Sequence, residues 1–292
     1  MIKKYLILTL LAVLYLSTGA CKKKESKVPD YHKGELTILT DPAFESVTTA
    51  LAEGYMYTYP DTKITVETKK EDLALLDLIN KKVKAVVMSR ELTPEEVDAY
   101  EKNVDLEVLP SNFAADAVIF VVPKNSTREK ITYEEIVAML QSENKELIFS
   151  GTNSSDLNYV AQTLKKKPAD LKYSIISGSE NLIAELEKYP GKVGAIGLNI
   201  LSRPYGKEAT KLREQIKILP VEKKGKLHEA TPNELLEMTY PFTRVLYFLN
   251  NEGNFAIASG FIRYSCTHLG QMIVQKEGLQ KYNLYMREVQ MR

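Results

Sequence analysis

The sequence predicts an α/β protein with two lobes, each built on a mostly parallel sheet flanked by helices. The chain has 292 residues, and a single hydrophobic core rarely grows beyond roughly 250–300 residues, so two lobes are expected. From Glu35 onward, short strand-like segments alternate with helix-like ones, which is the pattern of βαβ units. Residues 85–88 (AVVM) are apolar throughout, as is usual for a strand that is buried on both faces of a parallel sheet.

The first 20 residues have the features of a signal peptide. Lys3 and Lys4 precede an apolar stretch, residues 6–16, that is too short to cross a bilayer comfortably. Small residues then lead to Cys21, an arrangement that resembles a bacterial lipobox. We therefore predict cleavage after residue 20 and lipidation of Cys21; an uncleaved anchor and an ordinary secretory signal are the alternatives. Residues 21–33 are mostly polar and predict a lipidated tether, which places the protein in the cell envelope, on a periplasmic or other extracytoplasmic face.

Charge and cysteine content narrow the possible partners. The chain has 39 Lys and Arg residues against 38 Asp and Glu residues, and removal of residues 1–20 would leave 37 against 38. A nearly neutral chain without a basic face has no electrostatic basis for binding nucleic acid. Cys21 and Cys266 are the two cysteines of the sequence. Lipidation of the first would leave the second without a partner, so no structural disulfide is expected.

The expected strands and helices follow one another along the whole chain. The expected strands cover residues 36–39, 63–67, 85–88, 117–122, 146–149, 193–198 and 244–249. Helices are expected from the Asp41–Pro42 turn to about residue 59, over 71–80, and over 256–276, the last as one long amphipathic helix. Thr93, Thr132 and Thr231 each precede a glutamate by three residues, which predicts three capped helix starts with a structural role.

No catalytic machinery is recognisable. His32, His228 and His268 are scattered without zinc-ligand spacing, and the sequence contains neither a G-x-S-x-G elbow nor a P-loop. The glycines of residues 191–197 have the wrong spacing for a dinucleotide fingerprint and lead into a strand instead of a helix. Adjacent glutamates at 95–96 and 134–135 lie in first helical turns, where carboxylates interact favourably with the helix dipole; nothing else supports a glycosidase-like acid pair. We expect no metal, no cofactor and no enzymatic activity.

Anion-binding groups are easier to find, and the first lie where residues 36–39 turn into a helix. Asp41 would cap this helix, and the backbone N–H groups of Ala43, Phe44 and Glu45 would point out of the carboxyl end of the strand. Open α/β sheets bind ligands at this end. Capping alone is the structural alternative, and the two roles are compatible.

Two further junctions have the same character. Residues 151–156 follow a strand and contain Asn153, Ser154 and Ser155, whose short polar side chains and helix-start amides suit an oxyanion. A plain polar loop is the alternative. Ser89 and Arg90 follow the apolar strand 85–88, and arginine offers a forked donor pair to carboxylate or phosphate, although a lone arginine is more often a surface residue. Hydrogen bonds to a charged group contribute about 1.5–3 kcal/mol each, so a handful of them would make a micromolar site, which needs about 8 kcal/mol.

A set of short segments along the chain carries a resemblance to a known family: residues 40–44, 59–61, 89–96, 115–117, 153–155, 195–197, 240–244, 260–261, 270–271 and 278–279. In their order and spacing, these segments resemble the substrate-binding lipoproteins of phosphate transporters, which belong to the type II periplasmic binding protein superfamily.

The resemblance implies two lobes with the ligand in the cleft between them. Lobe one would contain residues 34–113 and 240–292, and lobe two residues 114–239. Asp116 would lie at the crossover, and the ligand would be held from lobe one by the junctions at Ala43–Phe44 and Ser89–Arg90 and from lobe two by residues 153–155. Better-known phosphate binders have an aspartate near the place of Arg90 and an arginine near Phe149–Ser150, so the resemblance leaves phosphate specificity open.

The resulting functional prediction is an exported lipoprotein, expected to be a monomer, that binds inorganic phosphate or a related oxyanion. It would deliver the ligand to the permease of an ABC importer and would touch the membrane only through its lipid. One alternative is a binding-lobe protein without a transport role, acting as an anion sensor or a surface interaction lipoprotein. A phosphohydrolase is the other alternative, which the missing metal ligands and nucleophile disfavour.

Overall fold

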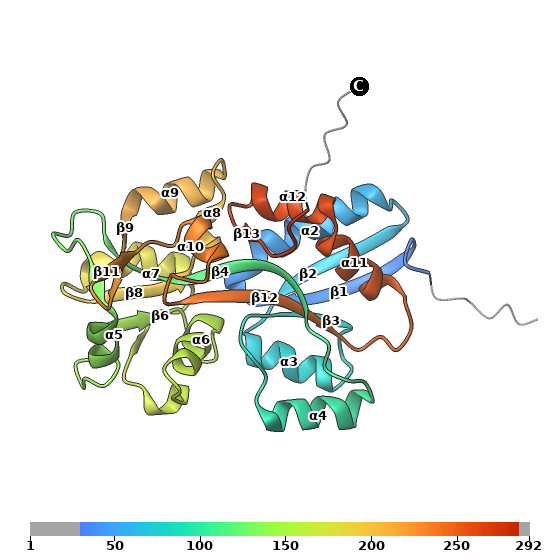
Figure 1. Ribbon diagram of the computed structural model, residues 1–292, viewed down its shortest axis with the longest axis horizontal. Helices are drawn as coiled ribbons and strands as arrows, with labels where there is room; N and C mark the ends of the chain where they lie inside the picture. The colour runs from blue at the N-terminus through green and yellow to red at the C-terminus, as the bar shows by residue number, and fades with distance from the viewer. Residues whose placement is uncertain (1–29, 286–292) are drawn as a thin grey trace, which may run out of the picture.

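The computed structural model describes residues 30–285. The predicted signal peptide and Cys21 lie outside these residues, so both stay predictions. Within the described residues, no helix is long and apolar enough to cross a membrane. Two groups of helices and strands lie side by side, joined by two long strands (Figure 1).

A mixed sheet of ten strands runs through both groups. Its strands are β1 (Gly34–Thr40), β2 (Thr62–Thr68), β3 (Ala85–Met88), β4 (Ser111–Pro123), β6 (Leu147–Phe149), β7 (Ser174–Ile175), β8 (Val193–Gly197), β9 (Ile216–Leu219), β12 (Thr243–Asn250) and β13 (Gln280–Lys281). Their order is β2-β1-β3-β12-β4-β8-β6-β7, and β9 and β13 also pair with β4. A small second sheet contains β5 (Ile131–Thr132), β10 (Val221–Lys223) and β11 (Lys226–His228).

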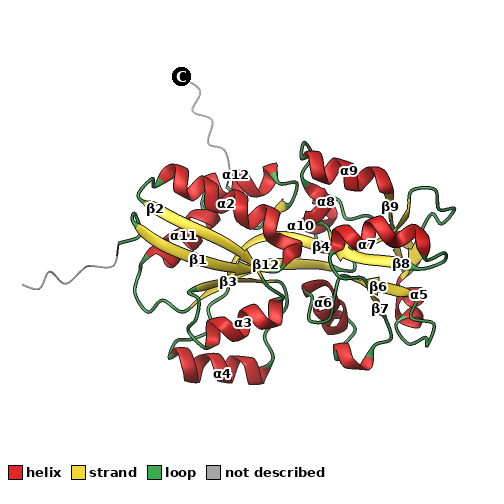
Figure 2. Ribbon diagram, turned by 180° about the vertical axis from the view of Figure 1, so that it is seen from behind, coloured by secondary structure: helices red, strands yellow, loops and turns green. Residues whose placement is uncertain are grey.

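Helices cover both faces of the large sheet, as the view from behind also shows (Figure 2). They are η1 (Pro42–Phe44), α2 (Glu45–Thr58), α3 (Glu71–Ile79), α4 (Pro94–Val104), α5 (Tyr133–Met139), α6 (Ser155–Thr163), η2 (Pro168–Asp170), α7 (Ser179–Glu185), η3 (Leu186–Lys188), α8 (Asn199–Ser202), α9 (Lys207–Gln215), α10 (Pro232–Leu236), α11 (Ile257–Cys266) and α12 (His268–Lys276). In the group around β1–β3, helices α2, α11 and α12 cover one face and α3 and α4 the other. In the group around β6–β8, α7 to α9 lie on one face and α5 and α6 on the other (Figure 1).

Strand β4 belongs to both groups. Its first part pairs antiparallel with β12 as far as Ala117, and from Val118 onward it pairs with β8. We call the part with β1–β3, α2–α4, α11 and α12 the first lobe, and the part with β6–β9 and α5–α9 the second lobe. The predicted boundary at 113/114 falls inside β4, and the exact division of the chain stays a proposal.

Seven strands were expected, and all seven form. The parallel pairs β1–β2, β1–β3, β6–β7 and β6–β8 confirm the βαβ character, while β12 and β4 run antiparallel to their neighbours. Strand β4 begins at Ser111, six residues earlier than expected. The short strands β5, β7, β9, β10, β11 and β13 were not expected, because two to four residues carry almost no periodic signal.

The expected single helix over residues 256–276 is wrong. Thr267 is extended (φ −76°, ψ 172°) and separates α11 from α12. The chain folds back closely at this break, since a Cβ on Gly270 would lie 2.5 Å from the carbonyl oxygen of Ser265. The apolar periodicity continues across the break because both helices pack on the same face of the sheet.

The predicted capped starts are confirmed for α4 and α5, where Thr93 and Thr132 form complete capping boxes. The third start, at α10, is half formed. The Thr231 hydroxyl accepts from the Glu234 amide, but the Glu234 carboxylate bonds to Nδ1 of His228 at 2.8 Å instead of returning to the cap.

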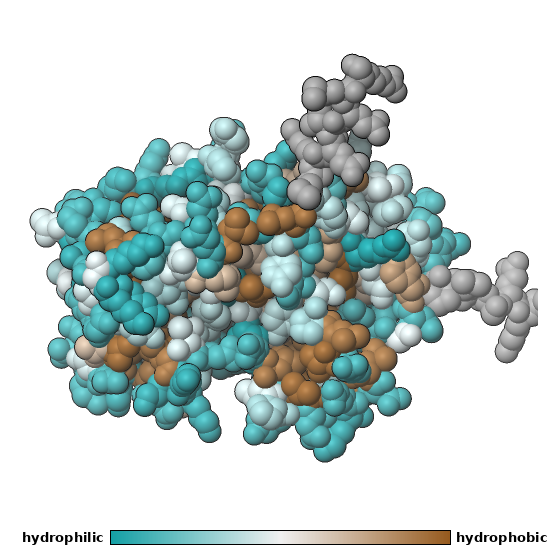
Figure 3. Space-filling view, in the orientation of Figure 1, coloured by the Kyte–Doolittle hydropathy of each residue, from teal (hydrophilic) through white to brown (hydrophobic). Residues whose placement is uncertain are grey.

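One apolar core continues through both lobes, and a smaller cluster lies between α3, α4 and the sheet. One face of the molecule is mostly hydrophilic, with an apolar area near α4 and the segment that leads into β4 (Figure 3). Leu109 in this segment is 67% exposed. Because the core is continuous, polar residues that are buried between the lobes lie in a largely apolar interior, where each needs a hydrogen-bond or ion-pair partner.

Candidate functional site

The first feature of the site is the turn from β1 into η1 and α2. Asp41 is buried and extended, and its Oδ1 accepts a hydrogen bond from the Ala43 amide at 3.1 Å. Pro42 follows as the first helical residue, where its missing N–H costs nothing. The Phe44 amide donates to the Asp41 carbonyl oxygen and the Glu45 amide to Pro42. The three amides that were expected to be free thus have partners within the turn.

The starts of three helices meet at Asp41. Its Oδ2 accepts from the amides of Glu71, at 3.3 Å, and Ser155, at 3.2 Å. Glu71 begins α3 in the first lobe, and Ser155 begins α6 in the second. Helix N-termini present unsatisfied N–H groups and a partial positive charge, which favour an anion. One carboxylate therefore receives amide donors from both lobes.

Arg244 is the cation of this region. It lies on β12 opposite Asp116 of β4 and is fully buried. Its Nε and Nη2 donate to Asp116 Oδ2 at 2.9 and 2.7 Å, and Nη2 also donates to Asp156 Oδ1 at 2.9 Å. Its guanidinium carbon lies 4.5 Å from the ring centre of Phe44. Since Asp116 Oδ1 accepts from the Asn199 amide at 3.0 Å, the Asp116 carboxylate is engaged on both oxygens.

Glu71 is a fully buried carboxyl at the start of α3. Its Oε1 accepts from the amide and the hydroxyl of Ser89, at 2.6 and 2.8 Å. Its Oε2 has no hydrogen-bond partner among residues 30–285 and lies 3.7 Å from Nε of Arg90. Burial raises the pKa of Glu71 to about 7, although Arg90 opposes the shift and Asp41 adds to it. This carboxyl consequently takes up a proton near neutral pH.

Asp156 has a similar environment in the second lobe. Burial raises the pKa of Asp156 to about 6 against the effect of Arg244. Its Oδ2 has no partner, and the same is true of the Ser155 hydroxyl and of Nη1 of Arg244, all of them buried. Two donors and two acceptors, counting Glu71 Oε2, are thus left unsatisfied among residues 30–285 in this one region, which is unusual for a packed interior.

Arg90 is bound by carboxylates of its own lobe. Its two terminal nitrogens form a forked pair with Glu96 at 2.7 and 2.8 Å, and Nη2 also donates to Asp72 at 2.7 Å. The side chain is 8% exposed. Asp72 in turn accepts from Asn158 of α6 at 2.8 Å. The guanidinium therefore organises the first lobe beside α6, and its donors are directed to Glu96 and Asp72 and not to the carboxylate of Asp41 that the amides bind.

The lobes make direct polar contacts on both sides of Asp41. Glu91 and Gln162 exchange two hydrogen bonds of 3.0 Å. On the other side, the Val47 amide donates to Asn199 at 3.2 Å, and Ser202 donates to the Glu277 carbonyl oxygen at 2.5 Å. With these contacts in place, the two lobes are closed on one another.

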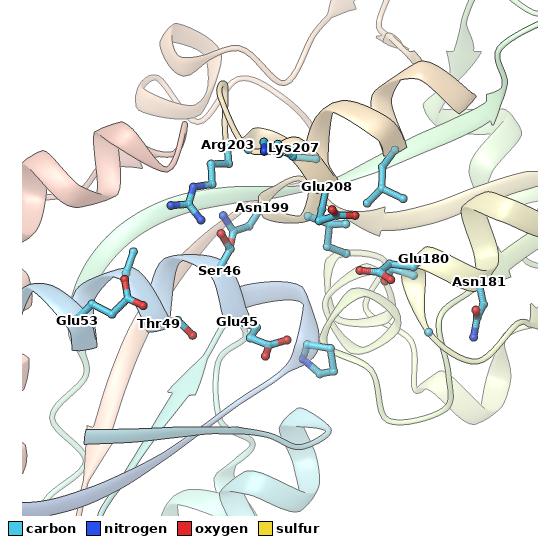
Figure 4. Close-up of a pocket in the computed structure, with 18 residues that line it drawn as sticks. Glu45, Ser46, Thr49, Glu53, Glu180, Asn181, Asn199, Arg203, Lys207 and Glu208 are labelled. Carbon is cyan, nitrogen blue, oxygen red and sulfur yellow. The ribbon is translucent and has the colours of Figure 1, made fainter. Parts of the chain in front are cut away.

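A cavity of about 590 Å³ opens between α2, α7, α8 and α9. Its labelled side chains come from both lobes and include four carboxylates, Glu45, Glu53, Glu180 and Glu208 (Figure 4). The two cations there are Arg203, which is 3.2 Å from Glu277, and Lys207. This acidic lining does not suit an anion. The converging amides at Asp41 make the better anion site, although Asp41 and the residues that donate to it are buried.

The sequence-predicted residues divide into two groups in the structure. Asp41, Ala43, Phe44, Asp116 and Ser155 lie around one point between the lobes. Ser89 is engaged by Glu71, Ser154 caps α6 through the Leu157 amide, and Glu45 and Asn153 are exposed. Whether any of them contacts a ligand stays a prediction.

Sequence reasoning missed Arg244, Glu71 and Asp156 as site residues. Arg244 was included in an apolar strand and in the segment 240–244 of the resemblance, without a role in binding, and its partners are 88 and 128 residues away. Glu71 and Asp156 are first-turn acids, which usually serve the helix dipole in solvent. A charged residue at the head of a strand as apolar as RVLYFL was the one available signal, because a buried arginine requires buried partners.

Several known proteins with solved structures resemble this chain. One is a Clostridium perfringens protein described as a substrate-binding protein of a phosphate ABC transporter and solved with bound phosphate. It is 20% identical in sequence, its TM-score is 0.69, and the match covers 85% of this chain and 99% of the Clostridium protein. A phosphate transport receptor from Vibrio cholerae is 15% identical with a TM-score of 0.63, over 85% and 100%. A protein from Planctomyces limnophilus, described as phosphate binding, is 18% identical with a TM-score of 0.57, over 85% and 93%.

At these identities the likeness shows the fold, which is that of the type II periplasmic binding proteins. A search of the curated proteins finds no match. The model of the family described as PBP superfamily domain matches residues 26–267, which is most of the chain. With two lobes joined by β4 and β12 and a polar centre between them, the chain belongs to this family of periplasmic-binding-protein domains.

Proposed function

We propose that this chain is the substrate-binding component of an ABC importer and that it binds a small oxyanion between its lobes, with inorganic phosphate as the first candidate. The observation that carries the proposal is the convergence of amides from Ala43, Glu71 and Ser155 on one negatively charged group. Amides held by three helix starts keep their direction without further ordering, and they recognise an anion by shape and charge. The named function of the similar structures agrees with this ligand class.

The charges around the site are compatible with a small anion. Asp116 is neutralised by Arg244, so it adds little net charge. The pKa values of Glu71 and Asp156 are raised to about 7 and 6, so each carboxyl loses its negative charge, and its repulsion of an anion, as the pH falls through that value. Nη1 of Arg244 and the Ser155 hydroxyl are buried donors that have no partner within the described residues. An oxyanion with three or four oxygens would satisfy donors that a carboxylate cannot reach.

Titration calorimetry of residues 22–292 with phosphate, arsenate, sulfate and acetate tests the ligand class. We expect at least one oxyanion to bind with micromolar affinity, which corresponds to a binding free energy of about 8 kcal/mol. The same anion should raise the melting temperature of the chain. Absence of both effects with every anion at millimolar concentration contradicts the proposal.

Transport also requires delivery. We propose that the chain is exported, anchored through Cys21 on an extracytoplasmic face of the cell envelope, and recognised by the permease as a monomer. Mass spectrometry of the membrane-associated protein tests the anchor, which requires a diacylglyceryl group on Cys21 and no residues 1–20. Loss of phosphate uptake on deletion of the gene tests the transport role.

One observation favours the second candidate, a binding-lobe protein that acts as a sensor or interaction lipoprotein without transport. The amides of the site already have a partner within the chain, Asp41, and the lobes are closed on it. A binding protein that has no transport role does not have to release a ligand to a permease, so it could remain in this closed form. Normal uptake in the deletion strain, together with anion binding by the purified chain, would favour the sensor.

A further inference from the structure

The carboxylate of Asp41 has the surroundings of a bound oxyanion. All three of its hydrogen bonds come from backbone amides: Ala43 donates to Oδ1 at 3.1 Å, and Glu71 and Ser155 donate to Oδ2 at 3.3 and 3.2 Å. A capping aspartate needs only the first of these bonds. The other two come from the starts of other helices, one of them in the other lobe.

The site contains more hydrogen-bonding groups than the carboxylate uses. The Ser155 hydroxyl belongs to the same residue as the amide that donates to Oδ2, yet it is buried and has no hydrogen-bond partner in the part of the chain that the structure describes. The same holds for Nη1 of Arg244, whose side chain lies over Phe44 of the same turn. Buried donors are rarely left unsatisfied, so this arrangement fits a larger anion better than it fits the side chain that now fills it.

The position of Asp41 leaves no space for a second anion. Asp41 is 1% exposed, and Ala43, Phe44 and Ser155 are buried with it. The packing is tight on the side of β8, where a Cβ on Gly197 would meet Nη2 of Arg244 at 2.7 Å and the Cβ of Ala43 at 3.0 Å. A second negative charge beside Asp41 would also be repelled in this low-dielectric interior.

We infer that Asp41 is an intramolecular competitor of the ligand: its carboxylate occupies the oxyanion position and bridges the lobes, and a free oxyanion binds only when Asp41 leaves. This inference rests on the proposed function, since it places the oxyanion at the same amides. It makes Asp41 a specificity-determining residue, because only an anion that recruits additional donors, such as the Ser155 hydroxyl, has an advantage over the carboxylate already present.

The test compares phosphate binding by calorimetry for the unaltered chain and for Asp41→Ala, both over residues 22–292. Removal of the carboxylate empties the position and exposes the three amides to solvent anions. We expect Asp41→Ala to bind phosphate at least about tenfold more tightly, and phosphate to raise its melting temperature more than that of the unaltered chain. Glu53→Gln is the matched control: it removes a negative charge from α2, the helix that follows the same turn, but Glu53 is exposed and lies outside the junction, so affinity should stay within about threefold of the unaltered chain.

The outcomes separate the inference from the proposed function. Binding by Asp41→Ala alone supports the inference and contradicts anion binding by the unaltered chain. Equal or weaker binding by Asp41→Ala, while the unaltered chain binds, overturns the inference and leaves the proposed function standing. Failure of both to bind overturns both. Should Asp41→Ala not fold, Asp41→Asn replaces it, because asparagine keeps the size and one acceptor oxygen of the side chain. The inference then requires that Asp41→Asn bind phosphate at least about threefold more tightly than the unaltered chain.

Discussion

Two junctions of the first lobe, at Asp41 and at Arg90, look alike in sequence and differ in the structure. Both follow a buried strand of the sheet, and both were expected to offer donors to an anion. At Asp41 the donors are backbone amides, whose direction is fixed by three helix starts. At Arg90 the donors belong to a flexible side chain, and Glu96 and Asp72 of the same lobe bind them. Backbone donors thus remain where the fold puts them, whereas the side-chain donors of Arg90 pair with nearby carboxylates.

The largest expected effect is the loss of Arg244, which supports the Asp41 junction. Arg244→Met removes the one guanidinium that pairs with Asp116 and Asp156, both of them fully buried. Leaving buried carboxylates without a partner should lower the free energy of unfolding by about 3–5 kcal/mol. Urea denaturation measures it, with Arg263→Met on the exposed face of α11 as the control. A loss no larger than that of the control would show that the buried ion pairs do not stabilise the fold.

Glu71 gives a pH-dependent effect. Its pKa is about 7 in the folded chain against an ordinary value of 4.5, so the folded state holds the proton more tightly. Its contribution to stability is full below pH 4.5 and is lost as the pH rises through about 7. Over the whole range the loss is about 3 kcal/mol at 1.4 kcal/mol per pH unit.

Glu71→Gln should therefore be more stable than the unaltered chain at pH 8, and the difference should shrink toward pH 5. Melting temperatures of the two chains between pH 5 and 8 measure this difference directly. Asp156, with a pKa near 6, remains in both chains and cancels in the comparison. Parallel curves over this range would contradict a raised pKa for Glu71.

A smaller effect is expected at Arg90. Arg90→Ala should lower the free energy of unfolding by about 1–3 kcal/mol, because Glu96 and Asp72 are partly exposed and regain solvent. Anion affinity should change by less than about threefold, since the guanidinium donates to Glu96 and Asp72 and not to the group that the amides around Asp41 bind. Lys102→Ala, which breaks an exposed pair with Asp98, is the control for stability. A tenfold loss of anion affinity would return Arg90 to the site.

Local signals in the sequence were enough to predict much of the fold. The strand 85–88 is apolar throughout, and the boxes at Thr93 and Thr132 use residues three positions apart, so these features depend on neighbours in the chain. The break at Thr267 was not predicted, because α11 and α12 bury the same face and the periodicity runs through it.

The site was predictable only in part. The strand-to-helix turns at Asp41 and Ser155 are local, and the structure brings them together. The partners of Arg244 are 88 and 128 residues away, and nothing local indicates them. The hydrogen bond from the Ser155 amide to Asp41, 114 residues away in the sequence, also depends on how the two lobes meet. No local sequence pattern encodes that arrangement.

The most direct test of the central role of the backbone amides is a matched pair of variants at Ser155. Ser155 is the first residue of α6, where proline is tolerated, and Ser154 before it is already extended (φ −75°, ψ 147°). Ser155→Pro removes the amide hydrogen, while Ser155→Ala removes only the hydroxyl. In the Asp41→Ala background, calorimetry should show about tenfold or more weaker phosphate binding for Ser155→Pro than for Ser155→Ala, as expected for one lost bond to a charged group. Equal affinities of the two variants would contradict anion binding by the Ser155 backbone amide.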